Sequence, residues 1–247
     1  MTRYSLHGGH NRIVQGANWG NRKEHIMDRQ VKDAVAVKLR DLGHTVYDDT
    51  DETGATQPQN VSNIVRNCNT HDVDLVISFH LNAYNGSANG VEVCYYDQQS
   101  LAAKVSAQLS KDIGWSNRGA KQRTDLYVLN STKAPAILIE LGFIDNDTDM
   151  AKWDVDKIAN AIVYALTGQT FGSDNNRADS SAQPSKGVGV VTITADVLRV
   201  RTGPGTNYDI VKKVYRSERY QSWGIQNGWH NVGGDQWVSG EYVRFEG

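Results

Sequence analysis

A predominantly apolar run, Leu75–Phe79, is the feature that most restricts how this chain folds, and it is followed at once by His80. A run with so little polar alternation is typical of a strand covered on both faces, as in sheets flanked by helices. In open α/β sheets, functional side chains gather at the carboxyl ends of the strands. The run therefore predicts an α/β fold with a site beside His80.

Helical and strand patterns alternate around this run over the first two thirds of the chain. Alternation of this kind predicts a mixed, twisted sheet flanked by helices. The expected helices are Lys23–Leu42, Asn60–Asn69, Leu101–Ile113 and Val155–Leu166, and the expected strands are Tyr4–Leu6, Thr45–Tyr47, Leu75–Phe79, Gly90–Tyr96, Leu126–Leu129 and Ala136–Leu141.

The composition changes at residues 170–187, where small polar residues dominate and little can be buried. Such a segment is typical of a flexible linker, so we expect a first domain over 1–169 and a second over 188–247. The second domain has short strand patterns separated by Gly, Pro, Asn and Asp, which predicts a small all-β barrel. Some of its aromatic residues should fill the core, and others should remain exposed for ligand contact.

Bulk properties exclude several classes of protein. The formal net charge of -2 gives no reason to expect a nucleic-acid partner or a basic membrane anchor. No run approaches the roughly 18 apolar residues of a membrane span. The two cysteines, Cys68 and Cys94, are too few for a disulfide scaffold and are not spaced as a metal pair.

The residues after Met1 contain no apolar signal segment and no small-residue cleavage site. We therefore expect a protein made in the cytoplasm that requires another agent to release it if it acts outside. A trimmed N-terminus would give the same pattern.

Three side chains form a candidate zinc set, namely His10, Glu24 and His80. Two imidazoles and one carboxylate suit Zn²⁺, and three protein ligands leave a fourth position for water. Glycines beside His10 allow a sharp turn after the first strand. Glu24 has an equally good structural explanation, because a carboxylate near a helix start is favoured by the helix dipole.

Glu140 is the fourth candidate, since it interrupts the apolar strand Ala136–Leu141. A carboxylate in such surroundings is costly unless it is paired, hydrogen-bonded or close to a metal. Apolar surroundings should raise its pKa, which suits a general base and acid. The alternative is a glutamate on a solvated face of the strand.

These segments, taken in order over about residues 3 to 168, resemble the zinc-dependent N-acetylmuramoyl-L-alanine amidases of the amidase-3 type. The resemblance is to the catalytic domains of phage endolysins that attack Gram-positive walls in particular. The segments that carry it are Gly9-His10, Gly16-Ala17, Glu24 with Asp28, Ser78–Ala83, Gly90–Val93, Asn117–Lys121, Tyr127–Asn130 and Pro135–Ile144.

The resemblance implies that His10, Glu24 and His80 are zinc ligands and that Glu140 is the catalytic glutamate. His7 is a rival to His10, because His7-Gly8-Gly9 imitates the family's first-ligand motif. His10 is preferred because the Gly16-Ala17 pair lies at the family's distance from it. Asp28 departs from the asparagine that the family often has there.

The second domain resembles a bacterial SH3 domain through residues 195–208, Gly228-Trp229 and Gln236–Val238. That resemblance implies binding to wall peptides or glycans. Tyr208, Trp223 and Trp229 are candidate wall-binding residues. In the first domain, Asn82, Arg118 and Lys121 are candidate substrate contacts, and a solvated loop is the alternative for the two cations.

The implied function is hydrolysis of the peptidoglycan amide between N-acetylmuramic acid and L-alanine, with zinc as cofactor and Glu140 as proton carrier. Two alternatives remain open. One is a zinc peptidase acting within the stem peptide of the wall. The other is a wall-binding protein without catalytic activity.

Overall fold

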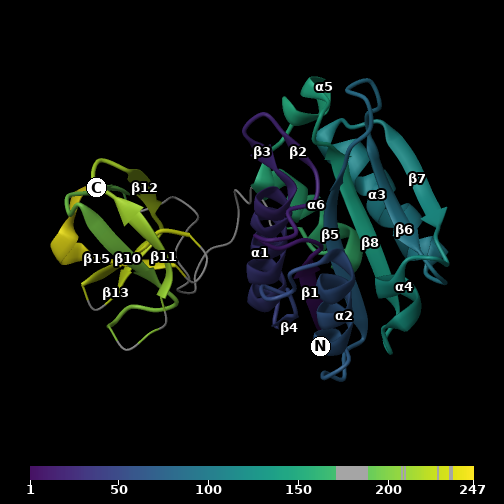
Figure 1. Ribbon diagram of the computed structural model, residues 1–247, viewed down its shortest axis with the longest axis horizontal. Coiled ribbons are helices and arrows are strands. Elements are labelled where there is room, and N and C mark those ends of the chain that lie inside the picture. The colour runs from purple at the N-terminus through teal and green to yellow at the C-terminus, as the bar shows by residue number, and fades with distance from the viewer. Residues whose placement is uncertain (171–188, 207, 209, 227, 234–235) are drawn as a thin grey trace. The chain divides into compact units, whose positions relative to one another are not determined.

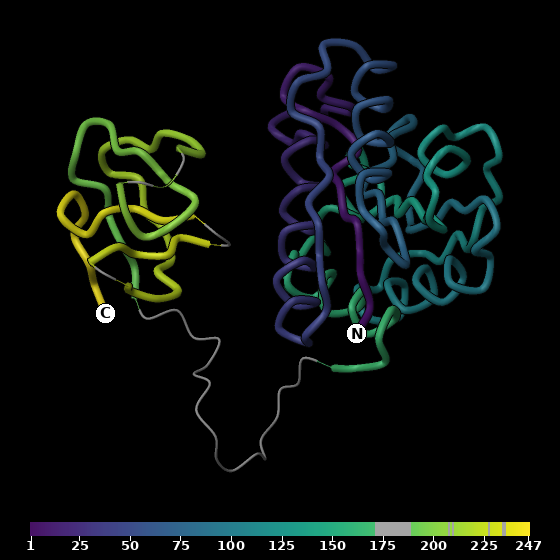
Figure 2. The backbone as a smooth tube through the Cα atoms, turned by 90° about the horizontal axis from the view of Figure 1, so that it is seen from below, coloured from purple at the N-terminus to yellow at the C-terminus, as the bar shows by residue number. Residues whose placement is uncertain are grey.

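The computed structural model describes residues 1–170, 189–206, 208, 210–226, 228–233 and 236–247. The chain divides into two compact units, with the boundary inside 171–188. The linker predicted at 170–187 falls outside the described residues, apart from Thr170. Each unit is described separately, and Figures 1 and 2 trace their elements.

The first unit is built on a six-stranded mixed sheet in the order β4-β1-β5-β8-β6-β7. Neighbouring strands are parallel except for the β6–β8 pair, which is antiparallel. This confirms the predicted mixed sheet. The strands are β1 (Arg3–Gly8), β4 (Thr45–Asp48), β5 (Leu75–Asn82), β6 (Val91–Tyr95), β7 (Asn117–Gln122) and β8 (Ala136–Phe143), with a separate small hairpin of β2 (Asn18–Trp19) and β3 (Arg22–Lys23).

Helices flank the sheet, and two hydrophobic clusters lie against it. The larger cluster joins α1, α3 and α6 to the strands through residues such as Leu39, Phe79 and Ile139. The smaller cluster joins α2 and α4 to Val76 and Leu138. Alternate residues of β5 and β8 thus enter different clusters, as expected of strands covered on both faces. The helices are α1 (Glu24–Asp41), α2 (Gln57–Cys68), α3 (Gln99–Ile113), α4 (Tyr127–Ser131), α5 (Asp147–Met150) and α6 (Val155–Thr167).

The strand predicted over Leu126–Leu129 is wrong, because this segment begins the short helix α4. The amides of Leu129 and Asn130 both donate to the carbonyl of Leu126, which closes a helical turn. Val128 and Leu129 are buried side by side in the smaller cluster. Two adjacent apolar residues fit a strand or a single helical turn equally well, so the local pattern could not decide.

The second unit contains two antiparallel sheets. β11, β10, β15, β14 and β13 form one in that order, and β12, β9 and β16 form the other. Its fully buried core is aliphatic and includes Val191, Val200 and Val238, and of the aromatic residues expected there Tyr220 packs against it while partly buried. The elements are β9 (Gly189–Ile193), β10 (Val197–Arg201), β11 (Ile210–Tyr215), β12 (Arg219–Ser222), β13 (Gly224–Gln226), β14 (Trp229–Asn231), β15 (Trp237–Ser239), η1 (Gly240–Tyr242) and β16 (Val243–Glu246).

None of the helices among the described residues is both long enough and apolar enough to cross a bilayer.

Candidate metal centre and catalytic carboxylate

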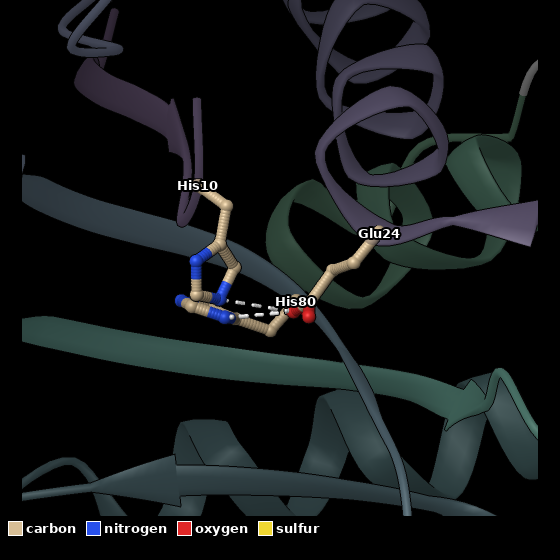
Figure 3. A group of neighbouring side chains, drawn as sticks. All are labelled: His10, Glu24 and His80. Atoms are coloured by element: carbon tan, nitrogen blue, oxygen red, sulfur yellow. Dashed lines mark hydrogen bonds and ion pairs between the residues drawn. The ribbon is translucent and has the colours of Figure 1, made fainter. Parts of the chain in front are cut away.

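Three side chains from three separate elements converge near the carboxyl ends of β1 and β5 (Figure 3). His10 follows β1, Glu24 is the first residue of α1, and His80 lies in β5. Oε1 of Glu24 is 3.4 Å from Nε2 of His10 and 3.1 Å from Nδ1 of His80. The two imidazole rings meet edge to face, with centroids 5.0 Å apart. The structure therefore brings the three predicted ligands together.

The backbone holds the Glu24 carboxylate in place. Its Oε2 accepts a hydrogen bond from the amide of Ala17 at 2.6 Å, and its Oε1 accepts one from the amide of Leu81 at 3.0 Å. The carboxylate thus joins the loop after β1 to the end of β5. This gives Glu24 a positioning role in addition to any favourable interaction with the helix dipole.

Two glycines leave room for the cluster. A Cβ at Gly9 would lie 1.9 Å from the His80 ring. Gly16 has a φ of +70°, and a Cβ there would lie 2.4 Å from Oε2 of Glu24. Any other residue at Gly9 would displace the His80 ring, and at Gly16 it would also be strained.

The charges within the cluster stabilise one another. Burial alone would raise the pKa of Glu24, but its hydrogen bonds to His10 and His80 outweigh burial and lower it. Burial opposes protonation of His10, but Glu24 raises its pKa overall. At His80 burial prevails over the attraction of Glu24, and the pKa is lowered. An ionised carboxylate beside a histidine that favours its neutral form is suited to metal ligation.

The donor set fits a metal ion. One ligand atom from each of the three residues lies within 4.8 Å of the others. Among the described residues, this is the group of His, Cys, Asp or Glu side chains that lie close enough together to hold a metal ion. Two imidazole nitrogens and a carboxylate oxygen are common ligands of Zn²⁺ and related divalent ions. Nδ1 of His10 is buried without a hydrogen-bond partner, and Nε2 of the same ring faces Glu24.

The rival His7 lies elsewhere. It is fully buried in β1, and its Nδ1 is 3.7 Å from Sγ of Cys68 in α2. Burial lowers its pKa to about 3, which keeps the ring neutral. The structure thus places His10, and not His7, beside Glu24 and His80.

Glu140 occupies the neighbouring strand at the level of the cluster. It lies in β8, directly in register with His80 of β5. Its side chain is partly exposed, but its Oε2 is buried and has no hydrogen-bond partner. Burial, reinforced by the charges of Glu24 and Glu92, raises the pKa of Glu140 to about 8. A carboxyl group whose pKa lies near neutrality is suited to taking up and returning a proton.

Glu92 continues a row of polar side chains that runs across the sheet from His80 of β5 to Glu140 of β8. The sequence patterns had not identified Glu92 as a site residue. It lies in β6 directly opposite Glu140. Its Oε2 accepts from Nε of Arg118 at 2.7 Å, and its Oε1 accepts from Nδ2 of Asn82 at 3.2 Å. The predicted substrate contacts Asn82 and Arg118 are therefore brought together by Glu92. The available signal was a lone carboxylate within the apolar run Val91–Tyr95, the same signal that identified Glu140.

Other predicted residues lie apart from this row. Lys121 is exposed on β7, in register with Cys94. Asp28 lies one turn beyond Glu24 in α1, fully buried with neither carboxylate oxygen hydrogen-bonded. Burial raises the pKa of Asp28 to about 7, although nearby Arg29 opposes this.

The three candidate wall-binding residues are distributed over the second unit. Trp223 and Tyr208 are exposed, while Trp229 is partly buried in β14 and lines a cavity. Neither Tyr208 nor Trp223 lines that cavity. The expectation of exposed aromatic residues is confirmed by these two and by Tyr215 and Tyr242.

Comparison with known proteins connects this site to a family. The sequence profile of the N-acetylmuramoyl-L-alanine amidases of the amidase-3 family matches residues 6–168. YqiI, an uncharacterized protein of Bacillus subtilis, is 30% identical over 172 residues, which cover 65% of this chain and 81% of YqiI. LytH of Staphylococcus aureus, a probable cell wall amidase, is 43% identical over 79 residues, which cover 31% of this chain.

The matches to curated cell wall amidases are partial on both sides. The chain spans 17% of the length of an uncharacterized cell wall amidase of Bacillus anthracis and 27% of LytH.

Solved structures give a consistent result. The catalytic domain of the CD27L endolysin targeting Clostridia Difficile is 29% identical and superposes with a TM-score of 0.63 over 70% of this chain and 100% of that domain. The matched residues 6–168 include the cluster of His10, Glu24 and His80, and they also include the neighbouring Glu140. The chain therefore belongs to the amidase-3 family of N-acetylmuramoyl-L-alanine amidases.

Proposed function

We propose that this protein is a zinc-dependent peptidoglycan amidase that hydrolyses the bond between the lactyl group of N-acetylmuramic acid and L-alanine. The observation that carries the proposal is the register pairing of Glu140 with His80, which sets a proton-accepting carboxyl beside the His10–Glu24–His80 cluster. Family membership supplies the substrate class.

His10, Glu24 and His80 would hold the zinc ion. When bound, zinc supplies Lewis acidity, which polarises a carbonyl and acidifies a water molecule. Glu140 takes a proton from the water molecule while the oxygen of that water attacks the amide carbonyl. The carbon–nitrogen bond then breaks, and Glu140 returns the proton to the departing amine of L-alanine. The products are a glycan with a free lactyl carboxylate and a stem peptide with a free L-alanine amine.

The Glu140→Gln variant tests this role, because glutamine keeps the size of the side chain and cannot accept the proton. We expect wall hydrolysis to fall by about 10²- to 10⁴-fold while bound zinc is retained. Purified walls are digested, and the new amino termini are identified chemically. New L-alanine amines support the amidase, and any other new amine supports the stem-peptide zinc peptidase instead.

Two results would contradict the proposal. A wild-type rate in Glu140→Gln removes the assigned role of Glu140. A wild-type chain that binds walls and releases no amine, with or without added zinc, is a wall-binding protein without catalysis.

We propose further that the second unit is an SH3-like wall-binding domain and that the whole protein acts as an endolysin. The resemblance of residues 195–208 to bacterial SH3 domains supports the first part, and the likeness to the CD27L catalytic domain supports the second. Synthesis in the cytoplasm followed by release onto the wall remains part of this proposal. Adding the purified protein to intact Gram-positive cells and to isolated walls tests the lytic activity directly.

A further inference from the structure

The second unit contains a cavity of about 550 Å³ on its five-stranded sheet. The side chains that give it chemical character are Arg199, Arg201, Lys213, Trp229, Glu241 and Tyr242. β10 and β11 supply the three cations, β14 supplies Trp229, and η1 supplies the remaining two residues. All of these residues belong to the second unit, so the cavity does not depend on the first.

Strand register explains why these side chains share one face. Arg199 and Arg201 are two residues apart in β10, where the intervening Val200 is fully buried in the core. Arg199 lies directly opposite Lys213 of β11. Ser239, which also lines the cavity, lies directly opposite Trp229. The outward face of this sheet therefore presents cations at one side and an indole at the other.

The charge arrangement points to an anionic ligand. Like charges placed directly opposite each other on neighbouring strands are destabilising. Within the residues that the structure describes, neither Arg199 nor Lys213 forms an ion pair. The lining contains three cations and the single carboxylate of Glu241. A bound anion would relieve the repulsion between Arg199 and Lys213 and would gain charge-assisted hydrogen bonds.

Arg201 is held in a defined orientation. Its Nη1 donates to the carbonyl of Tyr208 at 2.6 Å. Guanidinium groups bind phosphate and carboxylate through a planar fork of donors, and prior fixation reduces the entropy lost on binding.

The two aromatic residues provide the apolar part of the cavity. Tyr242 is 48% exposed and Trp229 is partly buried, so both combine an accessible ring with a polar group. Rings of this kind pack against the flat face of a sugar, while the cations contact its charged substituent. A free peptide carboxylate would use the cations and leave the rings without a partner.

We propose that this cavity binds an anionic glycopolymer of the bacterial wall, in which phosphate or carboxylate groups recur next to sugar rings. Two sources share this chemistry. One is a wall teichoic acid with sugar-substituted polyol phosphates, and the other is a glycan strand whose lactyl carboxylates have been freed from peptide. The proposal rests on the proposed function only for the location of the ligand in the wall.

The test uses the full chain with the double substitution Arg199→Gln and Lys213→Gln. The matched control is Arg216→Gln with Arg244→Gln, which removes the same charge from residues outside the cavity lining. The probes are purified glycosylated poly(ribitol phosphate) and glycan strands with free lactyl carboxylates. Titration calorimetry at low and high salt measures affinity, and circular dichroism checks that each variant is folded.

We expect the wild type and the control to bind at least one anionic polymer, and the cavity variant to bind it at least about tenfold more weakly. Binding should weaken with added salt. Binding of the phosphate polymer identifies teichoic acid as the source, and binding of the carboxylate glycan identifies the peptide-free strand. Equal affinity in the cavity variant and wild type, or no binding of either polymer by the wild type, overturns the proposal.

A separate assay keeps this result independent of the proposed amidase activity. Hydrolysis of a short soluble muramyl peptide should require the cluster in the first unit and should be unchanged in the cavity variant. If the wild type fails to hydrolyse that peptide, the proposed function fails while the polymer titrations still decide the cavity.

Discussion

Glu140 of β8 and Glu92 of β6 face each other across an antiparallel strand pair, two carboxylates in direct register. Arg118 pairs with Glu92 at 2.7 Å and partly neutralises it. Burial is the main cause of the raised pKa of Glu140, and the negative charges of Glu24 and Glu92 add to it. Glu92 thus acts electrostatically on the proposed general base, and Arg118 is the ion-pair partner of Glu92.

This arrangement predicts opposite effects for two substitutions. A general base acts when ionised, so hydrolysis rises with pH through the pKa of Glu140. Glu92→Gln removes a negative neighbour, and the rising limb of kcat/KM should move to lower pH. Arg118→Gln leaves Glu92 uncompensated, and the limb should move to higher pH. Rate profiles from pH 5 to 9 measure both, and shifts of the same sign in both variants contradict this electrostatic coupling.

Asp28 should make the metal-free protein lose stability as pH rises. Its pKa is about 7 in the fold against 3.8 for an unperturbed aspartate, so the folded chain retains a proton that the unfolded chain releases between these values. Stability from this group is present below the lower value and is lost as pH rises through the upper one. The Asp28→Asn variant should flatten this decline, which is on the order of a few kcal/mol.

Urea unfolding at several pH values in the presence of a chelator measures the decline. Asp41→Asn serves as the control, because Asp41 is exposed at the end of the same helix. An unchanged pH dependence in Asp28→Asn would show that Asp28 is ionised or hydrogen-bonded in the fold. Some decline should persist in the variant, because the pKa of Glu140 is raised in the same direction.

Much of the first unit was predictable because its strands are buried on both faces. The apolar runs before His80 and around Glu140 stand out in the sequence, and a polar residue within such a run is visible without a structure. The structure extends β5 beyond Phe79 to Asn82, so His80 lies within the strand and not after it. Local patterns determine these elements because their periodicity and their burial agree.

Features that depend on strand order were not predictable. β7 is a largely exposed polar edge strand, so it lacks the alternation that marks a strand. The row of Glu140, Glu92 and Arg118 exists because β6 lies between β8 and β7, and no local pattern encodes that order. The cavity of the second unit likewise depends on the register between β10 and β11.

Gly9 should be essential for the geometry of the cluster. In Gly9→Ala the new methyl group would lie 1.9 Å from the His80 ring, so the ring must leave its observed position beside Glu24. Displacement of a ligand should weaken zinc binding by about 10- to 100-fold. Gly224→Ala is the control, because no atom lies within 4 Å of its added Cβ. Competition with a chromophoric chelator gives both affinities, and wild-type affinity in Gly9→Ala would contradict the observed packing.

The final prediction separates His10 from His7 as a metal ligand. His10→Asn should lose bound zinc, because Nε2 of His10 lies 3.4 Å from the carboxylate that also contacts His80. His7→Asn should retain zinc, since the His7 ring contacts Cys68 instead. The buried His7 site tolerates change poorly, so zinc content is measured by elemental analysis only on the folded fraction after gel filtration. Retention of zinc by His10→Asn and its loss from folded His7→Asn would reverse the assignment, because His7 and not His10 would then be the ligand.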